Sequence, residues 1–216
     1  TILDDIDLNI IRDYIDWTPF FKAWSLAGSY PKILQDDVVG ETAQQLFDDA
    51  TTLLELIIKN KLLQAKAIFQ IFPADSQGDD ITIYHHMNKN QALAQFAFIR
   101  QQMKKPESKP NFCLADFIAP KESGVKDYFG LFAVTAGIGI EALIEQYSEE
   151  HDTYNDILIK AIADRLAEAT TEYLHEKIRK DYWGYAKDET LDNAELIKEQ
   201  YKGIRPAPGY PACPDH

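Results

Sequence analysis

The residue types that suggest chemistry most directly gather in residues 203–216, Gly-Ile-Arg-Pro-Ala-Pro-Gly-Tyr-Pro-Ala-Cys-Pro-Asp-His. Proline recurs there at every second or third position, so the segment should run extended, outside helices and sheets, with its backbone polar groups left to other partners. A polar ligand lying along it would supply them. Arg205 carries the planar guanidinium that suits a carboxylate, Gly209 would let a ligand approach the backbone, and Tyr210 offers its ring to a cation or purine. The alternative is a proline-rich surface tail without a ligand.

A pair of charges marks the long helix expected over residues 153–182. Apolar and aromatic side chains recur at helical spacing and form a stripe of Tyr154, Leu158, Ile162, Leu166, Ala169 and Tyr173. Arg165 falls in the middle of this stripe and Glu168 at its edge. Because an unpaired buried charge is costly, either the two residues pair with each other or one of them faces a ligand.

Other reactive side chains lack a supporting pattern. His85 and His86 are adjacent, so in a strand they would point to opposite faces. His151 and His175 have no second ligand at a suitable spacing. We therefore expect no metal site. We also expect no catalytic residue, because Cys213 has no visible base beside it and Cys113 has the surroundings of a core residue.

Helices are expected near both ends of the chain. Pro19 can open a short helix over residues 19–26, with Thr18 as its N-cap and Gly28 after its end. The apolar spacing over residues 41–63 predicts the clearest amphipathic helix. Further helices are expected over residues 140–150, 153–182 and, after a capping-box pattern, 192–201.

The middle of the chain reads as strands. Residues 66–72 and 80–85 predict an antiparallel hairpin around a turn at 73–79, and residues 112–118 and 128–135 predict two more strands. Residues 90–103 are ambiguous between strand and helix. The fold class expected is α+β, with an antiparallel sheet of short strands packed with long helices at both chain ends, in a single domain over residues 1–216.

Composition narrows the functional classes. The 216 residues carry 22 Lys and Arg against 35 Asp and Glu, a formal net charge of −13, so a nucleic-acid partner is not expected. The longest apolar runs are too short to span a membrane, and the acidic N-terminus is unlike a signal peptide. Two cysteines cannot form a disulfide framework, which favours a reducing, cytoplasmic location.

Residues 205–214, Arg-Pro-Ala-Pro-Gly-Tyr-Pro-Ala-Cys-Pro, closely resemble the S-adenosylmethionine-binding motif in the activation domain of cobalamin-dependent methionine synthase. Further blocks resemble that domain in the same order: residues 14–21, 24–28, 113–120, 163–169 and 172–176. Matches spread over the whole chain make the resemblance specific.

The resemblance implies a role in reactivation. In this family the cobalamin is occasionally oxidised to inactive cob(II)alamin. An electron from flavodoxin or an equivalent reductase, with a methyl group from S-adenosylmethionine, restores methylcobalamin. The activation domain binds S-adenosylmethionine and docks on the cobalamin-binding domain, and zinc belongs to other modules of the enzyme. The isolated chain is therefore expected to catalyse no reaction by itself.

The family's ligand contacts, carried over by the same resemblance, fall on Asp16, Glu168, Arg205, Ala207, Gly209 and Tyr210. The acids would provide acceptors and negative charge for the ammonium, the ribose hydroxyls or the sulfonium region. In the family the domain continues past the proline-rich motif, and the later segment adds a Tyr to the site. The resemblance therefore implies a C-terminally shortened domain.

The alternative function is a docking module without ligand binding of its own, held to the cobalamin domain or to flavodoxin. Two basic clusters could meet an acidic flavodoxin. One comprises Lys104, Lys105 and Lys109, and the other comprises Lys177, Arg179 and Lys180. Weaker association at high salt would favour this function over ligand binding.

Overall fold

The computed structural model describes residues 1–87, 91–149 and 152–214. By its internal contacts the chain divides into two compact units. Unit 1 comprises Thr1, Phe69–Phe132 and Gly203–His216, and unit 2 comprises Ile2–Ile68 and Ala133–Lys202. Two strands, β2 (Gln64–Gln77) and β5 (Asp127–Ile138), contribute residues to both units. The expectation of a single domain over residues 1–216 stays a prediction.

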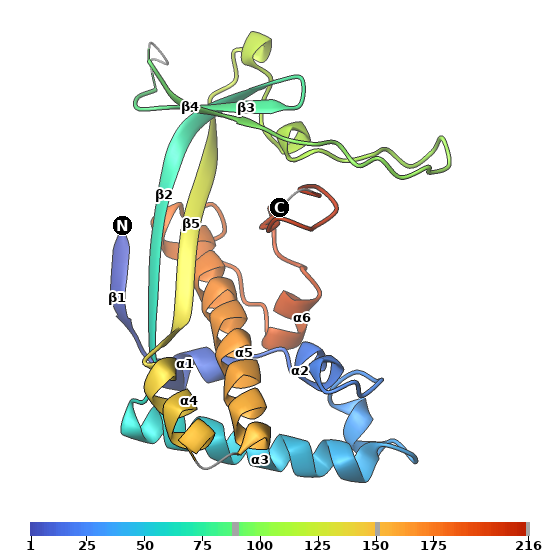
Figure 1. The fold of residues 1–216 in the computed structure, drawn as a ribbon. Helices are drawn as coiled ribbons and strands as arrows, with labels where there is room; N and C mark the ends of the chain where they lie inside the picture. Colours follow the sequence, from blue (N-terminus) through green and yellow to red (C-terminus); the bar gives the residue numbers. More distant parts are fainter. Residues whose placement is uncertain (88–90, 150–151, 215–216) are drawn as a thin grey trace. The chain divides into compact units, whose positions relative to one another are not determined.

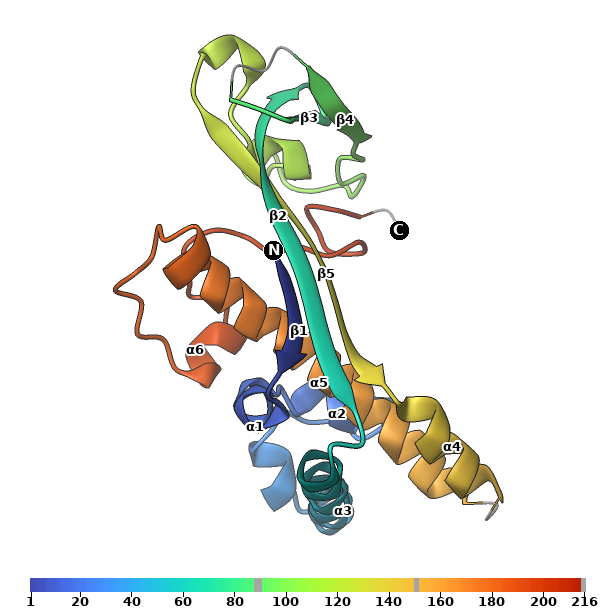
Figure 2. The ribbon, with the colours of Figure 1, turned by 90° about the vertical axis from the view of Figure 1, so that its left-hand side faces the viewer.

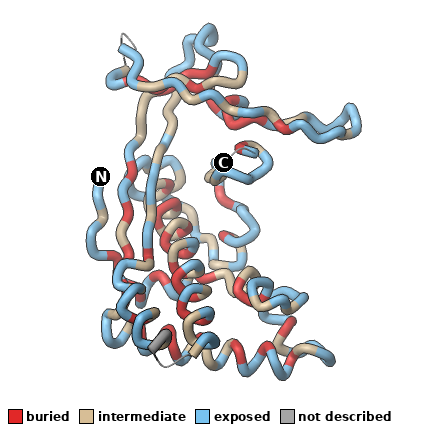
Figure 3. The backbone as a smooth tube through the Cα atoms, in the orientation of Figure 1, coloured by how far each residue is buried: buried red, intermediate tan, exposed pale blue. Residues whose placement is uncertain are grey.

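Unit 2 is built around α5 (Thr153–Lys177), which contacts α1 (Leu8–Ile11), α2 (Thr18–Ala23), α3 (Gly40–Asn60) and α4 (Ile140–Glu149), as Figure 1 shows. The buried positions follow the inner faces of α3 and α5 (Figure 3). These faces come from apolar residues at helical spacing, which are driven together because burying them removes apolar surface from water. On α5 they are Leu158, Ile159, Ile162, Leu166 and Ala169.

The strands form one sheet in which β1 (Ile2–Ile6), β2, β3 (Asp80–Tyr84) and β4 (Ala92–Ala97) are successive neighbours, and β5 pairs with β2 (Figure 2). The β1–β2, β2–β3 and β3–β4 pairs are antiparallel. Gln77 lies opposite Asp80, so the hairpin turns at Gly78, whose φ of 63° favours glycine. The predicted hairpin is confirmed, but the turn expected at 73–79 is wrong in extent because residues 73–77 continue β2.

The core of unit 1 joins β2 and β3 to a short 3-10 helix, Leu114–Phe117. The strand predicted over residues 112–118 is wrong. The Cys113 N–H donates to Asp116 Oδ2 at 2.9 Å, which closes a helical turn over the apolar residues that follow. Arg100 holds this turn to the hairpin through Asp116 and Asp79, each at 2.6 Å. A short apolar run is compatible with either structure, and here the side-chain cap decides.

The predicted helices are present with altered ends. The helix over residues 41–63 is confirmed as α3, and the long helix as α5, which continues into a π-helical turn at Ile178–Tyr182. The capping box of Asp192 and Glu195 is confirmed and begins α6 (Asn193–Ile197). The helix at 140–150 is confirmed as α4, although Glu150 lies outside the described residues. The α+β class is confirmed, with β2 and β5 longer than the short strands expected.

Candidate functional site

In unit 2, the segment from Tyr14 to Trp24 lies along α5. Near one end of the helix, Tyr14 packs edge-on against Tyr173, with ring centroids 5.5 Å apart, and its hydroxyl donates to Glu176 at 2.6 Å. Near the other end, the Trp24 ring lies 5.2 Å from the Tyr154 ring. The segment therefore runs antiparallel to α5, and both Asp16 and Glu168 belong to the stretch between these two contacts.

Asp16 is half-buried at the beginning of α2. Its Oδ1 accepts the backbone N–H of Thr18 at 2.9 Å, which satisfies a donor that the first helical turn leaves without a partner. The prediction that Thr18 is the N-cap is wrong, because Thr18 is the first residue of α2. Its hydroxyl accepts the Tyr30 N–H at 3.2 Å.

Glu168 forms an ion pair with Arg165 at 2.7 Å. Of the two alternatives for these residues, the structure shows the pairing. The Arg165 side chain is 16 % exposed and the Glu168 side chain 46 %, so the arginine stem is covered while the carboxylate reaches solvent. The Glu168 carboxylate therefore remains accessible to a ligand.

In unit 1, Ala207, Gly209 and Tyr210 lie in a tight turn over residues 207–213, and Arg205 precedes this turn by two residues. The prediction that this segment avoids helices and sheets is correct for the described residues 203–214. The expectation that it runs extended, with its backbone groups left to other partners, is wrong, because residues 207–213 fold into a turn that pairs several of these groups locally. The Gly209 N–H donates to the Cys213 carbonyl at 2.8 Å, the Tyr210 N–H to Ala207 at 3.1 Å, and the Cys213 N–H to Tyr210 at 2.9 Å. Gly209 has a φ of 97°, which a side chain would strain.

The predicted ligand residues thus form two groups, each described within its own unit. Asp16 and Glu168 belong to unit 2, and Arg205, Ala207, Gly209 and Tyr210 to unit 1. The Tyr210 residue is 44 % exposed, so its ring face is available, and Arg205 is half-buried.

Sequence reasoning missed a residue beside Asp16. Asn193, the first residue of α6, donates its side-chain N–H to the Ile15 carbonyl at 3.3 Å and so ties the peptide before Asp16 to α6. The capping-box pattern located Asn193 at a helix start, but no pattern in the chain indicated this long-range contact.

The expected basic cluster at Lys177, Arg179 and Lys180 is not a free basic surface. Arg179 is fully buried and paired with Glu189, while Lys177 pairs with Asp181 and Lys180 with Glu176. The spacing of Glu172, His175 and Arg179 along one helical face was the signal that could have indicated a buried network.

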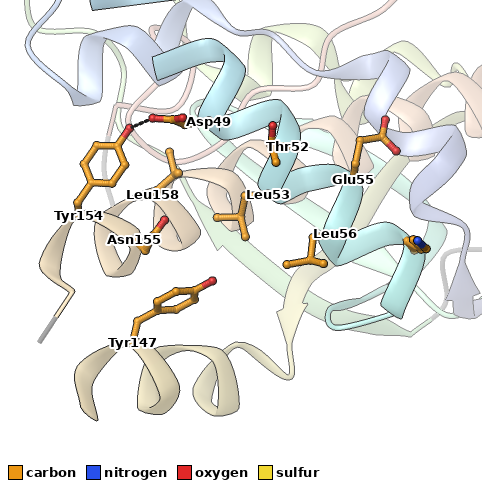
Figure 4. A pocket seen from close by; sticks show the side chains of 10 residues that line it. Asp49, Thr52, Leu53, Glu55, Leu56, Tyr147, Tyr154, Asn155 and Leu158 are labelled. Carbon is orange, nitrogen blue, oxygen red and sulfur yellow. Dashed lines mark hydrogen bonds between the residues drawn. The ribbon is translucent and has the colours of Figure 1, made fainter. Parts of the chain in front are cut away.

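A groove of about 520 Å³ lies among α3, α4 and α5 (Figure 4). Leu53 and Leu56 of α3 face Tyr147 of α4 and Tyr154 of α5 across it. The Tyr154 hydroxyl donates to Asp49 at 2.6 Å, and burial, reinforced by this hydrogen bond, raises the pKa of Tyr154 to about 12. The ligand residues predicted from the sequence do not line this groove.

Among residues 1–87, 91–149 and 152–214, no group of three or more His, Cys, Asp or Glu side chains is placed to hold a metal ion. His85 and His86 follow the end of β3, and His151 lies outside the described residues. Within the same described part of the chain, no helix has the length and apolar character needed to cross a membrane.

Comparison with known proteins places this fold in a class. Residues 7–216 match the family model for the activation domain of vitamin B12-dependent methionine synthase. The chain is also similar to the crystal structure of the MetH reactivation domain bound to AdoHcy, with 52 % sequence identity and a TM-score of 0.91. The match covers 99 % of this chain and 66 % of that one. This chain belongs to the methionine synthase activation-domain family, as its sequence blocks predicted.

Proposed function

We propose that this chain binds S-adenosylmethionine and presents its methyl group for the reductive remethylation of cob(II)alamin in a cobalamin-dependent methionine synthase. The observation that carries the proposal is the similarity, at 52 % identity, to a reactivation domain bound to AdoHcy. AdoHcy is what remains of S-adenosylmethionine after its methyl group has been transferred, so a site for one has most of the groups needed for the other.

The chain's own residues fit such a ligand. Arg205 offers two parallel N–H donors to the carboxylate of the methionyl part. Asp16 and Glu168 would take the ammonium, the ribose hydroxyls or the sulfonium region, and the Tyr210 ring would stack on the adenine. Ala207 and Gly209 would contribute backbone contacts through groups other than the Gly209 N–H, which donates to the Cys213 carbonyl.

Charge supports the same ligand. Unit 1 contains eight basic and eight acidic residues, so its own net charge is zero. The whole net charge of −13 therefore belongs to unit 2, which contains Asp16 and Glu168. A negative potential there attracts the sulfonium and ammonium of S-adenosylmethionine.

The chemical contribution of this chain is binding and orientation rather than acid–base catalysis. Cobalamin, when held by its own domain, supplies the methyl acceptor, and zinc belongs to other modules. Holding the sulfonium methyl in one direction removes much of the entropic cost of the transfer. No catalytic residue is needed for this role, and the isolated chain should not catalyse any reaction by itself.

The partners proposed are the cobalamin-binding domain and a flavodoxin or equivalent reductase, in the cytoplasm. Lys104 and Lys109 are exposed in unit 1, and Lys105 lies over the Phe112 ring at 5.4 Å from its centroid. This cluster is the basic surface that could meet an acidic reductase. A docking module without ligand binding remains the alternative, and it would show salt-sensitive association with no calorimetric response to S-adenosylmethionine.

Isothermal titration calorimetry of the chain with S-adenosylmethionine tests the proposal. We expect binding that Arg205→Ala weakens at least tenfold, or about 1.4 kcal/mol. Lys202→Ala is the matched control, because it removes an exposed neighbouring charge and should leave the affinity unchanged. If the Arg205→Ala variant binds with the same affinity as the parent chain, Arg205 is not part of the site. Binding by the whole enzyme but not by this chain would show that the residues of this chain are not sufficient to bind S-adenosylmethionine.

A further inference from the structure

A buried arginine occupies the end of the long helix in unit 2. Arg179 lies on the π-helical turn after α5 with 0 % of its surface exposed. Its Nε and one terminal nitrogen donate to Glu189 at 3.0 and 2.5 Å, in a bidentate pair. Its other terminal nitrogen lies 2.7 Å from His175 Nδ1. Since a guanidinium can only donate, His175 must accept at Nδ1 and carry its proton on Nε2.

The same arginine also holds the far end of the segment that follows it. Its guanidinium lies over the Tyr201 ring at 4.3 Å from the centroid, and the Tyr201 ring meets His175 edge-on at 4.8 Å. Nearby, the Tyr185 hydroxyl donates to the Lys202 carbonyl at 3.1 Å. The segment from residue 183 to 202 is therefore fastened at Glu189 in its middle and at Tyr201 near its end.

Stability alone is a weak reason for such a cluster. Taking several charges out of water costs free energy, and apolar residues of similar volume often stabilise a fold as well or better. A buried hydrogen-bonded cluster does specify one geometry, because its donors and acceptors are satisfied in only one arrangement. The element whose position is specified here is Tyr201, and Arg205 follows it after only three intervening residues.

We propose that Arg179 is a positioning residue for the ligand-binding segment. By holding Tyr201, it orders the last residues of unit 2, and within a few residues the chain continues into the segment that carries Arg205, Ala207, Gly209 and Tyr210. The inference rests on the proposed binding of S-adenosylmethionine and adds to it a residue that need not contact the ligand.

The test replaces the charged pair without leaving half of it buried. In the double variant Arg179→Met with Glu189→Leu, apolar side chains take the place of the bidentate pair. Glu172, whose carboxylate lies 3.9 Å from Arg179, then loses its nearby cation, so the fold of this variant is checked first by its melting temperature. Arg179→Lys is the second variant, because lysine keeps a charge opposite Glu189 but has neither the planar fork nor the flat face over Tyr201. Lys180→Met is the matched control, since Lys180 lies on the same turn and pairs with Glu176 near the surface.

Three measurements are made on each variant: the melting temperature, the affinity for S-adenosylmethionine, and hydrogen exchange of the backbone amides. We expect both Arg179 variants to lose about tenfold in affinity and to exchange faster at residues 200–205, with α3 protected as in the parent chain. Lys180→Met should change neither quantity. If the double variant does not fold, Arg179→Lys decides by the same criteria.

Parental affinity in a folded Arg179 variant would overturn the inference. So would a loss of affinity with unchanged exchange at residues 200–205, because the loss would then arise elsewhere. Absence of binding by the parent chain is a different result, since it would overturn the proposed function itself.

Discussion

Asp16 has a structural and a proposed functional task, and two substitutions can separate them. Its Oδ1 accepts the Thr18 N–H at 2.9 Å where α2 begins, and the proposed function gives its charge to the cationic part of S-adenosylmethionine. Asparagine can accept the same hydrogen bond without a charge, whereas alanine cannot accept it. Asp16→Asn therefore removes the charge alone, and Asp16→Ala removes both the charge and the hydrogen bond.

The expected magnitudes follow from the two contacts. Losing a side-chain cap at a helix start costs about 1 kcal/mol, which for a chain of this size lowers the melting temperature by roughly 2–4 °C. Asp16→Ala should show this loss, and Asp16→Asn should show almost none. In binding, a charge-assisted hydrogen bond is about twice as strong as a neutral one, so both variants should lose roughly 1–1.5 kcal/mol, or about tenfold in affinity.

Thermal unfolding and calorimetric titration on the same samples measure both effects. Asp13→Asn is the matched control, because the Asp13 side chain is 79 % exposed and loosely paired with Arg12 at 3.8 Å. The control should change neither the melting temperature nor the affinity. Unchanged binding by Asp16→Asn would refute a ligand role for the charge. A large drop in the melting temperature of the same variant would show instead that the fold depends on the charge.

Two further predictions concern local structure. Lys61 ends α3 in the left-handed conformation, with φ 52° and ψ 43°, so Lys61→Gly should raise the free energy of unfolding by about 0.5–1 kcal/mol in a urea titration. Lys59→Gly, inside the same helix, should lower it by about 1 kcal/mol, and effects of the same sign would contradict this reasoning. Arg100 holds the pKa of Asp116 below its ordinary value of 3.8, so this pair stabilises the fold above that pH and its contribution is lost as the pH falls through the lowered pKa. Asp116→Asn should therefore flatten the acid side of the stability curve measured by circular dichroism, and an unchanged acid side would count against the pair.

Sequence reasoning succeeded where one periodicity extends over several turns. The apolar spacing of α3 and α5 has one interpretation over that length, because only a helix places those residues on one face. It failed over residues 112–118, where a short apolar run fits a strand or a buried turn and the Asp116 side chain decides between them. It also failed at Thr18, since Trp17 is the N-cap residue of α2 and the side chain that accepts an N–H at the helix start belongs to Asp16.

Sequence reasoning also failed to predict long-range contacts. The burial of Arg179 depends on Glu189 and Tyr201. The position of Asp16 depends on a contact that Asn193, which is distant in sequence, makes with the preceding residue. Periodicity and local propensity carry no information on such pairs. The resemblance to the family supplied the proposed ligand residues, such as Asp16, which these signals could not indicate.

The C-terminal segment shows how a missed local contact changes the mechanism. Its prolines were read correctly as excluding helix and sheet, but the turn at Ala207–Cys213 already uses the N–H groups of Gly209, Tyr210 and Cys213. These donors are not available to a polar ligand lying along the segment unless the turn opens. The proposed recognition of S-adenosylmethionine would then depend more on the Arg205 guanidinium and the Tyr210 ring. A segment that is already turned also loses less conformational entropy when a ligand binds, so the same few contacts yield a higher affinity than a flexible tail would reach.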